Sequence, residues 1–280
     1  SAFGNMLSAL IGGPLLDLDG LLGFAGWQWV FLATGLPAVL MTAVVLLFLT
    51  DRPQHAKFLS SEEKGWLVQT LSKESPASAS HGNPLTALWD PRVLLLAVVY
   101  VLINISLFGV IYWMPTVVRG FGVTGTQNGL LTSIPWALSA VLLLWLPRRL
   151  RTEHAVLQAV AAIAVLGLLC FVASTMLPQD WMRFVALAIG TPCISVLYPC
   201  FWSIPPRYFT GGRAAASIGA ISTVGLLGGF LAQNLMPGVA QMTGRPVAAM
   251  LVPAVCLAVV GFAALARDLS LRSVSAPSQA

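Results

Sequence analysis

Charged residues are scarce in this sequence, since Asp, Glu, Lys and Arg together make up 9% of its 280 residues. Soluble domains carry roughly a quarter of their residues as these four types. Hydrophobic residues make up 57% of the chain. So little charge cannot cover a water-exposed surface. The composition therefore excludes an ordinary soluble domain and favours a protein embedded in a lipid bilayer.

Long stretches contain no Asp, Glu, Lys, Arg or His. A helix that crosses about 30 Å of hydrocarbon needs roughly 20 residues at about 1.5 Å each. Seven uncharged apolar stretches approach or exceed that length, namely residues 29–49, 93–118, 129–147, 155–177, 184–206, 214–244 and 246–266. An eighth, residues 2–16, is short, and because the chain opens with Ser1 we expect it to be cut inside a helix. The sequence therefore predicts an all-α membrane protein with about eight transmembrane helices.

Cysteine and histidine are also rare. The four cysteines, Cys170, Cys193, Cys200 and Cys256, lie inside apolar stretches and lack the paired spacing of a metal site, so we expect small buried apolar side chains. Without His or carboxylate in the membrane there is neither a nucleophile with its base nor a ligand set, so no enzyme activity, metal or cofactor is expected. The net charge of +5 comes from scattered basic residues, a pattern that does not favour nucleic-acid binding.

The basic residues separate into two sets when the loops are taken alternately. Twelve lie in one set of loops: Arg52, Lys57, Lys64, Lys73, Arg92, Arg148, Arg149, Arg151, Arg207, Arg213, Arg267 and Arg272. The opposite set holds three, Arg119, Arg183 and Arg245. Because Lys and Arg accumulate on the cytoplasmic side of a membrane, the larger set is expected inside the cell. This places the C-terminus in the cytoplasm.

One loop is much longer than the others and divides the chain into residues 1–50, 51–91 and 92–280, with two helices before it and six after it. Ser60 and Glu63 have the spacing of a capping box, which predicts a short cytosolic helix to about Lys73. The segment SPASASHGNP that follows is rich in Ser, Ala, Gly and Pro. It indicates a linker between two structural halves, with a boundary near residue 80.

The run GWQWVFLATGLPAVLMTAVVLLFLTDRPQHAKFLSSEEKGWL, from Gly26 to Leu67, resembles the sixth helix and central loop of the anion:cation symporter family, part of the major facilitator superfamily. Two further segments resemble the same family. They are IGGPLLDLDG and FWSIPPRYFTGGRAAASIGAISTVGLLGGF, the second being similar to the junction of the tenth and eleventh helices. The resemblance covers nearly the whole chain and implies that it corresponds to helices five to twelve of twelve.

The family resemblance implies a secondary transporter in a bacterial cytoplasmic membrane. It would move a small organic anion, a carboxylate, together with protons or another cation by alternating access. The basic and titrating residues of such symporters lie largely in the first four helices. The alternative is a truncated or degenerate fragment with no transport activity of its own. The missing helices favour that alternative, as does the loop LPRRLRTEHAV, which lacks the acid of the family's motif. Ser222, Thr223 and Leu226 stand where the family usually carries asparagines, a departure that bears on substrate preference and activity.

Polar side chains near the middle of the apolar stretches are the candidates for substrate contact, since such transporters bind substrate near the bilayer midplane. Tyr100, Asn104 and Phe108 fall four residues apart along one helix stripe, and Tyr112 continues it. A buried amide without a partner costs several kcal/mol in lipid. Asn104 must therefore face protein or water, so that substrate binding and a hydrogen bond between helices both remain open.

A second group of candidates lies in residues 184–206. Ser195, Tyr198 and Trp202 are spaced at i, i+3 and i+7, and Pro192 and Pro199 each remove a backbone hydrogen bond and can open the helix. The group resembles the cavity-lining tenth helix of the family. The aromatic residues have an alternative role in an interfacial belt, which fits Trp202 better than Tyr198.

Small residues recur at intervals of four, a pattern typical of close helix packing. The series are Gly4, Ser8 and Gly12; Ala215, Gly219 and Thr223; and Gly225 with Gly229. We expect each series to face a neighbouring helix, and Gly13 with Pro14 to bend the first one.

Overall fold

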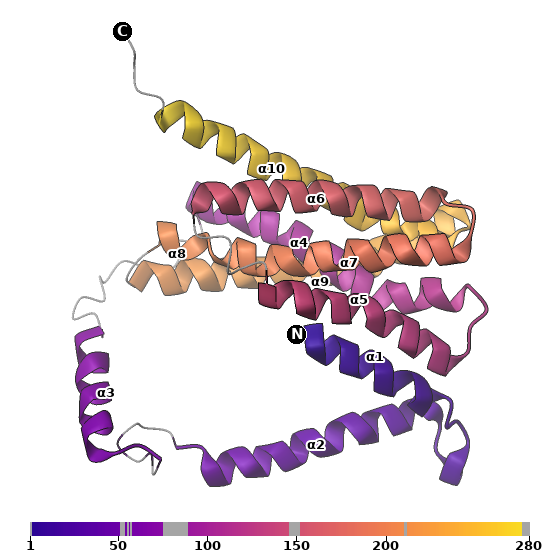
Figure 1. Cartoon of the computed structure of the whole chain (residues 1–280), viewed down its shortest axis with the longest axis horizontal. Coiled ribbons are helices and arrows are strands. Elements are labelled where there is room, and N and C mark those ends of the chain that lie inside the picture. The colour runs from indigo at the N-terminus through magenta and orange to yellow at the C-terminus, as the bar shows by residue number, and fades with distance from the viewer. Residues whose placement is uncertain are drawn as a thin grey trace.

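Helices are the regular elements in the part of the chain that the computed structural model describes, residues 2–50, 54, 56, 58–74, 89–145, 152–209 and 212–275 (Figure 1). In chain order they are α1 (Ala2–Leu16), η1 (Leu21–Gly23), α2 (Gly26–Phe48), α3 (Ser61–Glu74), α4 (Pro91–Arg119), α5 (Gly125–Trp145), α6 (Glu153–Met176), α7 (Asp180–Trp202), α8 (Pro205–Tyr208), α9 (Gly212–Thr243), η5 (Pro246–Met250) and α10 (Leu251–Ser275). The predicted all-α class is confirmed.

Seven helical segments in the described ranges are long and apolar enough to cross a bilayer. They are α2, α4, α5, α6, α7 with α8, α9, and η5 with α10. Helix α1, with 15 residues, is shorter, as its sequence predicted. The largest difference in bounds is at the end of α10, which runs to Ser275 and beyond the predicted residue 266. A helix needs apolar residues only where it lies in hydrocarbon, so α10 can continue through Arg267 and Asp268 beyond the apolar stretch.

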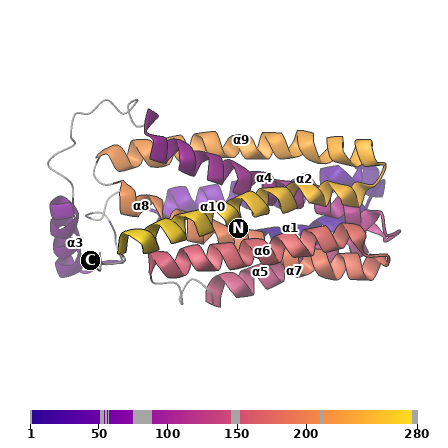
Figure 2. The ribbon, with the colours of Figure 1, turned by 90° about the horizontal axis from the view of Figure 1, so that it is seen from above.

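Helices α4 to α10 pack side by side into one bundle, seen from two directions in Figures 1 and 2. Helix α4 pairs with α9, α6 contacts both α7 and α10, and α5 lies against α7. The bundle is held together by fully buried apolar side chains, among them Phe171, Leu187, Ile194, Leu197 and Leu257. In lipid this close packing, rather than removal of apolar surface from water, provides the attraction between helices.

The contact between α4 and α9 depends on glycines. A Cβ atom added at Gly228 would lie 2.4 Å from the carbonyl oxygen of Val101, and one at Gly225 would lie 2.0 Å from the ring of Tyr100. At Gly229 the nearest atom would be the Phe108 ring, at 3.0 Å. The predicted packing role of Gly225 and Gly229 is confirmed, and Gly228 brings the two backbones closest.

The other two series of small residues make no such close contact within the described chain. Ala215, Gly219 and Thr223 are exposed, and a Cβ at Gly219 would meet no atom within 4 Å. In α1, a Cβ added at Gly4 or at Gly12 would likewise meet no atom within 4 Å. Because successive helix residues differ by about 100° in direction, the contact passes from Gly12 to its neighbour Gly13.

Helix α1 joins the bundle through α5. A Cβ at Gly13 would lie 2.5 Å from the carbonyl oxygen of Gly125, and one at Gly129 would lie 2.4 Å from that of Ala9. Figure 1 shows α2 continuing from α1 away from the other long helices. None of the most apolar 18-residue window of α2 is buried inside the structure. Helix α2 is therefore an apolar helix that touches the rest of the described chain mainly through α1.

The capping box at the start of α3 is confirmed. The Ser60 backbone N–H donates to Oε2 of Glu63 at 2.8 Å, and the Glu63 N–H donates to Oγ of Ser60 at 3.2 Å. Hydrogen bonds to the Glu63 carboxylate from the Ser60 backbone N–H and from the Ser60 side chain hold the pKa of that carboxyl below its usual value. The helix ends at Glu74, one residue after the predicted end. The predicted boundary near residue 80 and the basic residues Arg52, Lys57, Arg148, Arg149 and Arg151 lie outside the described residues.

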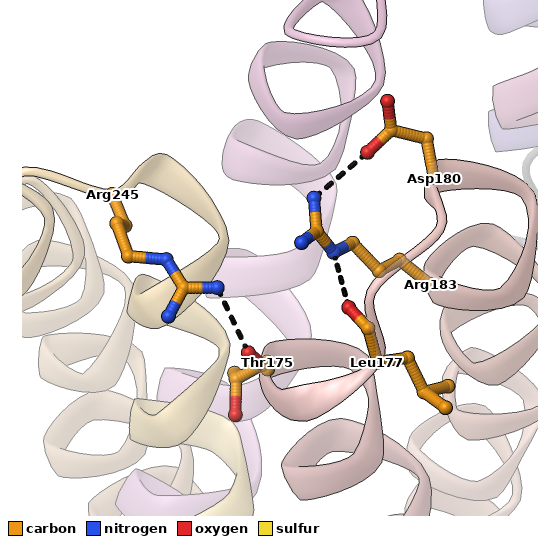
Figure 3. Close-up of polar contacts among 5 residues, drawn as sticks. All are labelled: Thr175, Leu177, Asp180, Arg183 and Arg245. Atoms are coloured by element: carbon orange, nitrogen blue, oxygen red, sulfur yellow. Dashed lines mark hydrogen bonds and ion pairs between the residues drawn. The ribbon is translucent and has the colours of Figure 1, made fainter.

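Two arginines of the smaller basic set stabilise the end of α6 (Figure 3). Arg183 Nε donates to the Leu177 carbonyl at 2.8 Å, and its Nη1 pairs with Asp180 at 2.8 Å. Arg245 Nη2 donates to the Thr175 carbonyl at 3.1 Å. The last carbonyls of a helix have no partner within the helix, and cations at that end are favourable. Arg183 and Arg245 thus have structural roles.

Helix α7 passes through both of its internal prolines without a break. It is continuous from Asp180 to Trp202, so the expected opening at Pro192 and Pro199 is not present. Buried residues extend along α7 from Ala186 to Phe201. Packing over this length holds the helix together despite the two missing N–H donors. The break comes after Trp202, where Ser203 and Ile204 separate α7 from α8.

Candidate functional site

Asn104 of α4 and Tyr198 of α7 meet inside the bundle. The Tyr198 hydroxyl donates to Oδ1 of Asn104, and Nδ2 of Asn104 donates to the Tyr100 carbonyl at 2.9 Å. Asn104 is 1% exposed and Tyr198 is partly buried. The expectation that the Asn104 amide faces protein or water is confirmed, since both of its partners are protein groups, and the contact with Tyr198 ties α4 to α7.

Aromatic rings enclose this polar pair. The Tyr100 ring stacks on Phe201, with centroids 4.9 Å apart and planes 9° apart. Its other aromatic neighbours are edge-on, Tyr198 at 5.7 Å and Trp202 at 5.0 Å. Gly225 of α9 leaves the space that the ring occupies. Tyr100, Asn104, Tyr198 and Trp202, which the sequence named from two separate helices, therefore form one cluster.

Ser195 lies elsewhere. Its hydroxyl is within hydrogen-bond distance of the Ser139 hydroxyl on α5, at 3.1 Å, and of the Thr191 carbonyl, at 3.3 Å. It is 7% exposed and joins α7 to α5 rather than facing Asn104. Its neighbour in the predicted stripe, Tyr198, points to α4 instead.

The predicted stripe on α4 also divides into two. Phe108 and Tyr112 stack on each other with centroids 6.1 Å apart, and Tyr112 is 54% exposed. Together with Thr116, Gln233 and Pro237 they line a cavity of about 240 Å³ between α4 and α9. Four residues turn a helix by about 40° more than one full turn, so positions at i, i+4, i+8 and i+12 drift around its surface. Tyr112 therefore does not continue the buried face of Asn104.

Three residues of the site were not predicted from the sequence. Phe201 stacks on Tyr100, Gly225 makes room for that ring, and Ser139 pairs with Ser195. Phe201 precedes Trp202, and Gly225 had been noted for packing alone, so a signal existed for both. Ser139 is one of several hydroxyl residues in its helix, and nothing in the sequence connects it with Ser195.

The chemistry of the cluster is that of neutral hydrogen bonds and flat apolar surfaces. It offers phenol hydroxyls, an amide and aromatic rings. Among the described residues, no group of three or more His, Cys, Asp or Glu is placed to hold a metal ion. The four cysteines are free, and Cys193, Cys200 and Cys256 are buried, as expected for small apolar side chains. The cluster therefore offers hydrogen bonds and ring stacking.

Known proteins resemble the chain closely in sequence. Residues 1–233 match the family model described as Major Facilitator Superfamily. A "Quinolone resistance transporter" of Acinetobacter baumannii is 39% identical over 81% of this chain and 53% of its own length. A "Putative tartrate transporter" of Agrobacterium vitis is 36% identical over 86% and 54%. A "Putative metabolite transport protein NicT" of Pseudomonas putida is 30% identical over 94% and 62%. The chain thus spans little more than half the length of these curated relatives.

Solved structures agree on the fold. The crystal structure of the transporter FucP in its outward conformation superposes with a TM-score of 0.55 at 16% identity, over 95% of this chain and 72% of that one. At this identity the likeness concerns the fold alone. With seven apolar helices of membrane-spanning length, the described chain is that of an integral membrane protein. Its family consists of transporters rather than enzymes, and the chain belongs to the major facilitator superfamily.

Proposed function

We propose that this chain is part of a secondary active transporter that moves a small organic carboxylate with protons or another cation by alternating access. The observation that carries the proposal is the Asn104–Tyr198 pair, buried among aromatic rings between two membrane helices. Polar groups deep in a membrane bundle are costly and tend to mark a substrate path. Two relatives described as putative tartrate transporters support a carboxylate.

In this proposal the cluster binds substrate by exchanging hydrogen bonds. The Tyr198 hydroxyl turns from Asn104 to a carboxylate oxygen, and the Asn104 amide donates a second hydrogen bond. Tyr100 and Trp202 provide flat walls for the carbon skeleton. Phe108 and Tyr112 line the path toward the cluster, and Ser195 fixes α7 against α5.

The domain division belongs to the same proposal. Residues 1–50 would be the last two helices of an N-terminal bundle, 51–91 the central cytoplasmic loop, and 92–280 the C-terminal six-helix bundle. The packing of α4 to α10 around one core supports the last assignment. We further propose a bacterial inner membrane as the location, with the C-terminus in the cytoplasm, which the bacterial relatives and the twelve-to-three division of Lys and Arg support.

Uptake by proteoliposomes tests the function. The full natural gene product is reconstituted, a pH gradient is imposed, and entry of labelled tartrate and other small carboxylates is measured. We expect gradient-dependent uptake that falls at least about tenfold in Asn104→Ala and Tyr198→Phe, the size of one lost charge-assisted hydrogen bond. Ser106→Ala is the matched control, because this buried hydroxyl of α4 donates to the Leu102 carbonyl of its own helix at 3.0 Å.

The possible outcomes separate function from site. Uptake by the wild type that Asn104→Ala and Tyr198→Phe leave unchanged would reject the cluster as the binding site while keeping the function. No uptake of any carboxylate by correctly folded protein would reject the function and favour the alternative of an inactive fragment.

A further inference from the structure

A second cavity, of about 240 Å³, lies where α4 begins and α10 ends. Four long helices and α8 surround it, and its walls are mainly apolar, with Leu96, Val99, Leu157, Leu197 and Val260 among the lining residues. Its volume is just below the roughly 300–1,000 Å³ of sites for drug-sized ligands. The interior therefore suits one segment of a hydrocarbon chain rather than a large molecule. The Asn104–Tyr198 pair does not line it.

Three charged side chains and one phenol lie at one end of this cavity. Arg92, Glu153, Tyr208 and Arg267 all contribute to its lining. The Tyr208 hydroxyl donates to Oε1 of Glu153 at 2.5 Å and accepts from Nη2 of Arg267 at 2.8 Å. The Arg267 guanidinium also lies 5.6 Å from the centre of the Tyr208 ring. These contacts fix Arg267 at the mouth of the cavity.

The charges at the mouth leave a positive excess. Two guanidinium groups, of Arg92 and Arg267, face one carboxylate, that of Glu153. The neighbouring Asp268 is paired with His154 and does not line the cavity. A ligand with one negative charge would balance the mouth. A polyanion would be repelled by the Glu153 carboxylate.

The position along the helices places this mouth at the edge of the hydrocarbon layer. Arg92 immediately precedes the uncharged stretch 93–118, and Arg267 immediately follows the stretch 246–266. Leu95 lines the cavity and is 63% exposed, so the cavity opens at the surface of the described bundle, one turn inward from Arg92. A ligand can therefore enter sideways from the bilayer with its polar end at the depth of the lipid headgroups.

We propose that this cavity binds an anionic amphiphile with one negative charge, whose head lies between Arg92 and Arg267 and whose chain enters the apolar interior. Basic pockets between helices on the cytoplasmic side of membrane proteins are suited to acidic lipid headgroups, and Arg is suited to phosphate oxygens. A phospholipid such as phosphatidylglycerol and a free fatty acid share this chemistry. The site is separate from the Asn104–Tyr198 cluster and does not depend on the substrate transported.

Lipid titration followed by native mass spectrometry tests the proposal on the full natural protein in detergent. Phosphatidylglycerol and phosphatidylcholine with the same acyl chains are compared. We expect tighter binding of phosphatidylglycerol, weakened about fivefold by Arg92→Gln or Arg267→Gln and about twenty-five-fold by both, with phosphatidylcholine unaffected. Arg267→Lys keeps the charge and should keep most of the binding.

Arg207→Gln is the matched control, because Arg207 is exposed, donates to the Ser203 carbonyl at 3.2 Å and does not line the cavity. Ala264→Phe fills the apolar interior and should weaken both lipids. Each variant must elute and melt like the wild type.

Competition by palmitate identifies the source of the ligand. Displacement of phosphatidylglycerol by palmitate, lost in the double variant, would support a free amphiphile as occupant. The proposal would be overturned if wild type and double variant bound phosphatidylglycerol equally. It would also be overturned if inorganic phosphate displaced phosphatidylglycerol as well as palmitate does.

Discussion

Asn104 and Tyr198 are either a structural contact between helices or part of a substrate site, and single substitutions distinguish the two. As a structural contact, a hydrogen bond between membrane helices is worth about 0.6 kcal/mol on average. We predict a coupling of about this size for Asn104→Ala and Tyr198→Phe in a double-mutant cycle on unfolding. If the pair also binds substrate, each single variant should lose far more uptake than stability. Uptake and stability that fall in proportion would leave Asn104 as a contact between helices.

The Asp17 carboxylate, at the junction of α1 and α5, should make the stability of the fold depend on pH. Its carboxylate accepts from the Thr126 hydroxyl at 2.5 Å and from the Thr126 N–H at 2.9 Å, which lowers the Asp17 pKa. A pKa that is lower in the folded state stabilises the fold above the unfolded value of about 3.9, and the gain is lost as the pH falls through the folded pKa.

The measurement for Asp17 is the melting temperature as a function of pH. At pH 6 the melting temperature of the wild type should be higher than that of Asp17→Asn. This difference should disappear as the pH falls below about 4. Glu62→Gln, on the exposed side of α3, controls for loss of a carboxylate elsewhere. A difference that is constant with pH would exclude the Thr126 contact as its cause.

At the scale of helices, α9 offers a matched pair of glycines. A Cβ at Gly228 would lie 2.4 Å from the Val101 carbonyl oxygen, whereas one at Gly219 would meet nothing within 4 Å. We predict that Gly228→Ala lowers the free energy of unfolding by about 1–3 kcal/mol, since the overpacked α4 and α9 must separate. Gly219→Ala should be neutral or stabilising by up to about 1 kcal/mol because Ala favours helix.

The comparison of the two glycines is made by thermal or denaturant unfolding in detergent. Equal melting of both alanine variants would mean that α4 and α9 do not approach as closely as the structure has them. A Cβ at Gly219 would also meet no atom of the Asn104–Tyr198 cluster within 4 Å, so uptake by Gly219→Ala serves as a test that the protein remains native.

The sequence predicts the helices well and their contacts poorly. Length and absence of charge define a membrane helix, so α4, α6 and α9 begin and end within a few residues of the uncharged stretches. Which face of a helix makes contact depends on the partner, and one residue changes direction by about 100°. For this reason the contact was assigned to Gly12 when it belongs to Gly13.

In the candidate site, too, single residues could be predicted from the sequence but their contacts between helices could not. Asn104 was identifiable because it is the lone amide in its stretch and must find a partner. Its partner Tyr198 is 94 residues away along the chain. Helical spacing relates residues on one helix only, so it grouped Ser195 with Tyr198, although they face different neighbours. Contacts between helices require the tertiary structure.

At the scale of the whole molecule, the position of the arginines predicts orientation. Arg183 and Arg245 are held by helix carbonyls at one end of the bundle, while Arg92, Arg207 and Arg267 lie toward the other. Helix ends that bind arginine for structural reasons account for part of the smaller set. The excess of basic residues on the opposite side is the topological signal.

Cysteine labelling from outside the cell tests this orientation. Gln241→Cys, at the end of α9, should react with a maleimide that does not cross membranes, and Glu62→Cys, on α3, should react only after the cells are opened. Both positions are exposed. The buried Cys193, Cys200 and Cys256 should remain silent, and Cys170→Ser removes the half-buried fourth thiol from the background. Labelling of Glu62→Cys in intact cells would invert the topology, and it would also place the mouth formed by Arg92 and Arg267 at the outer leaflet.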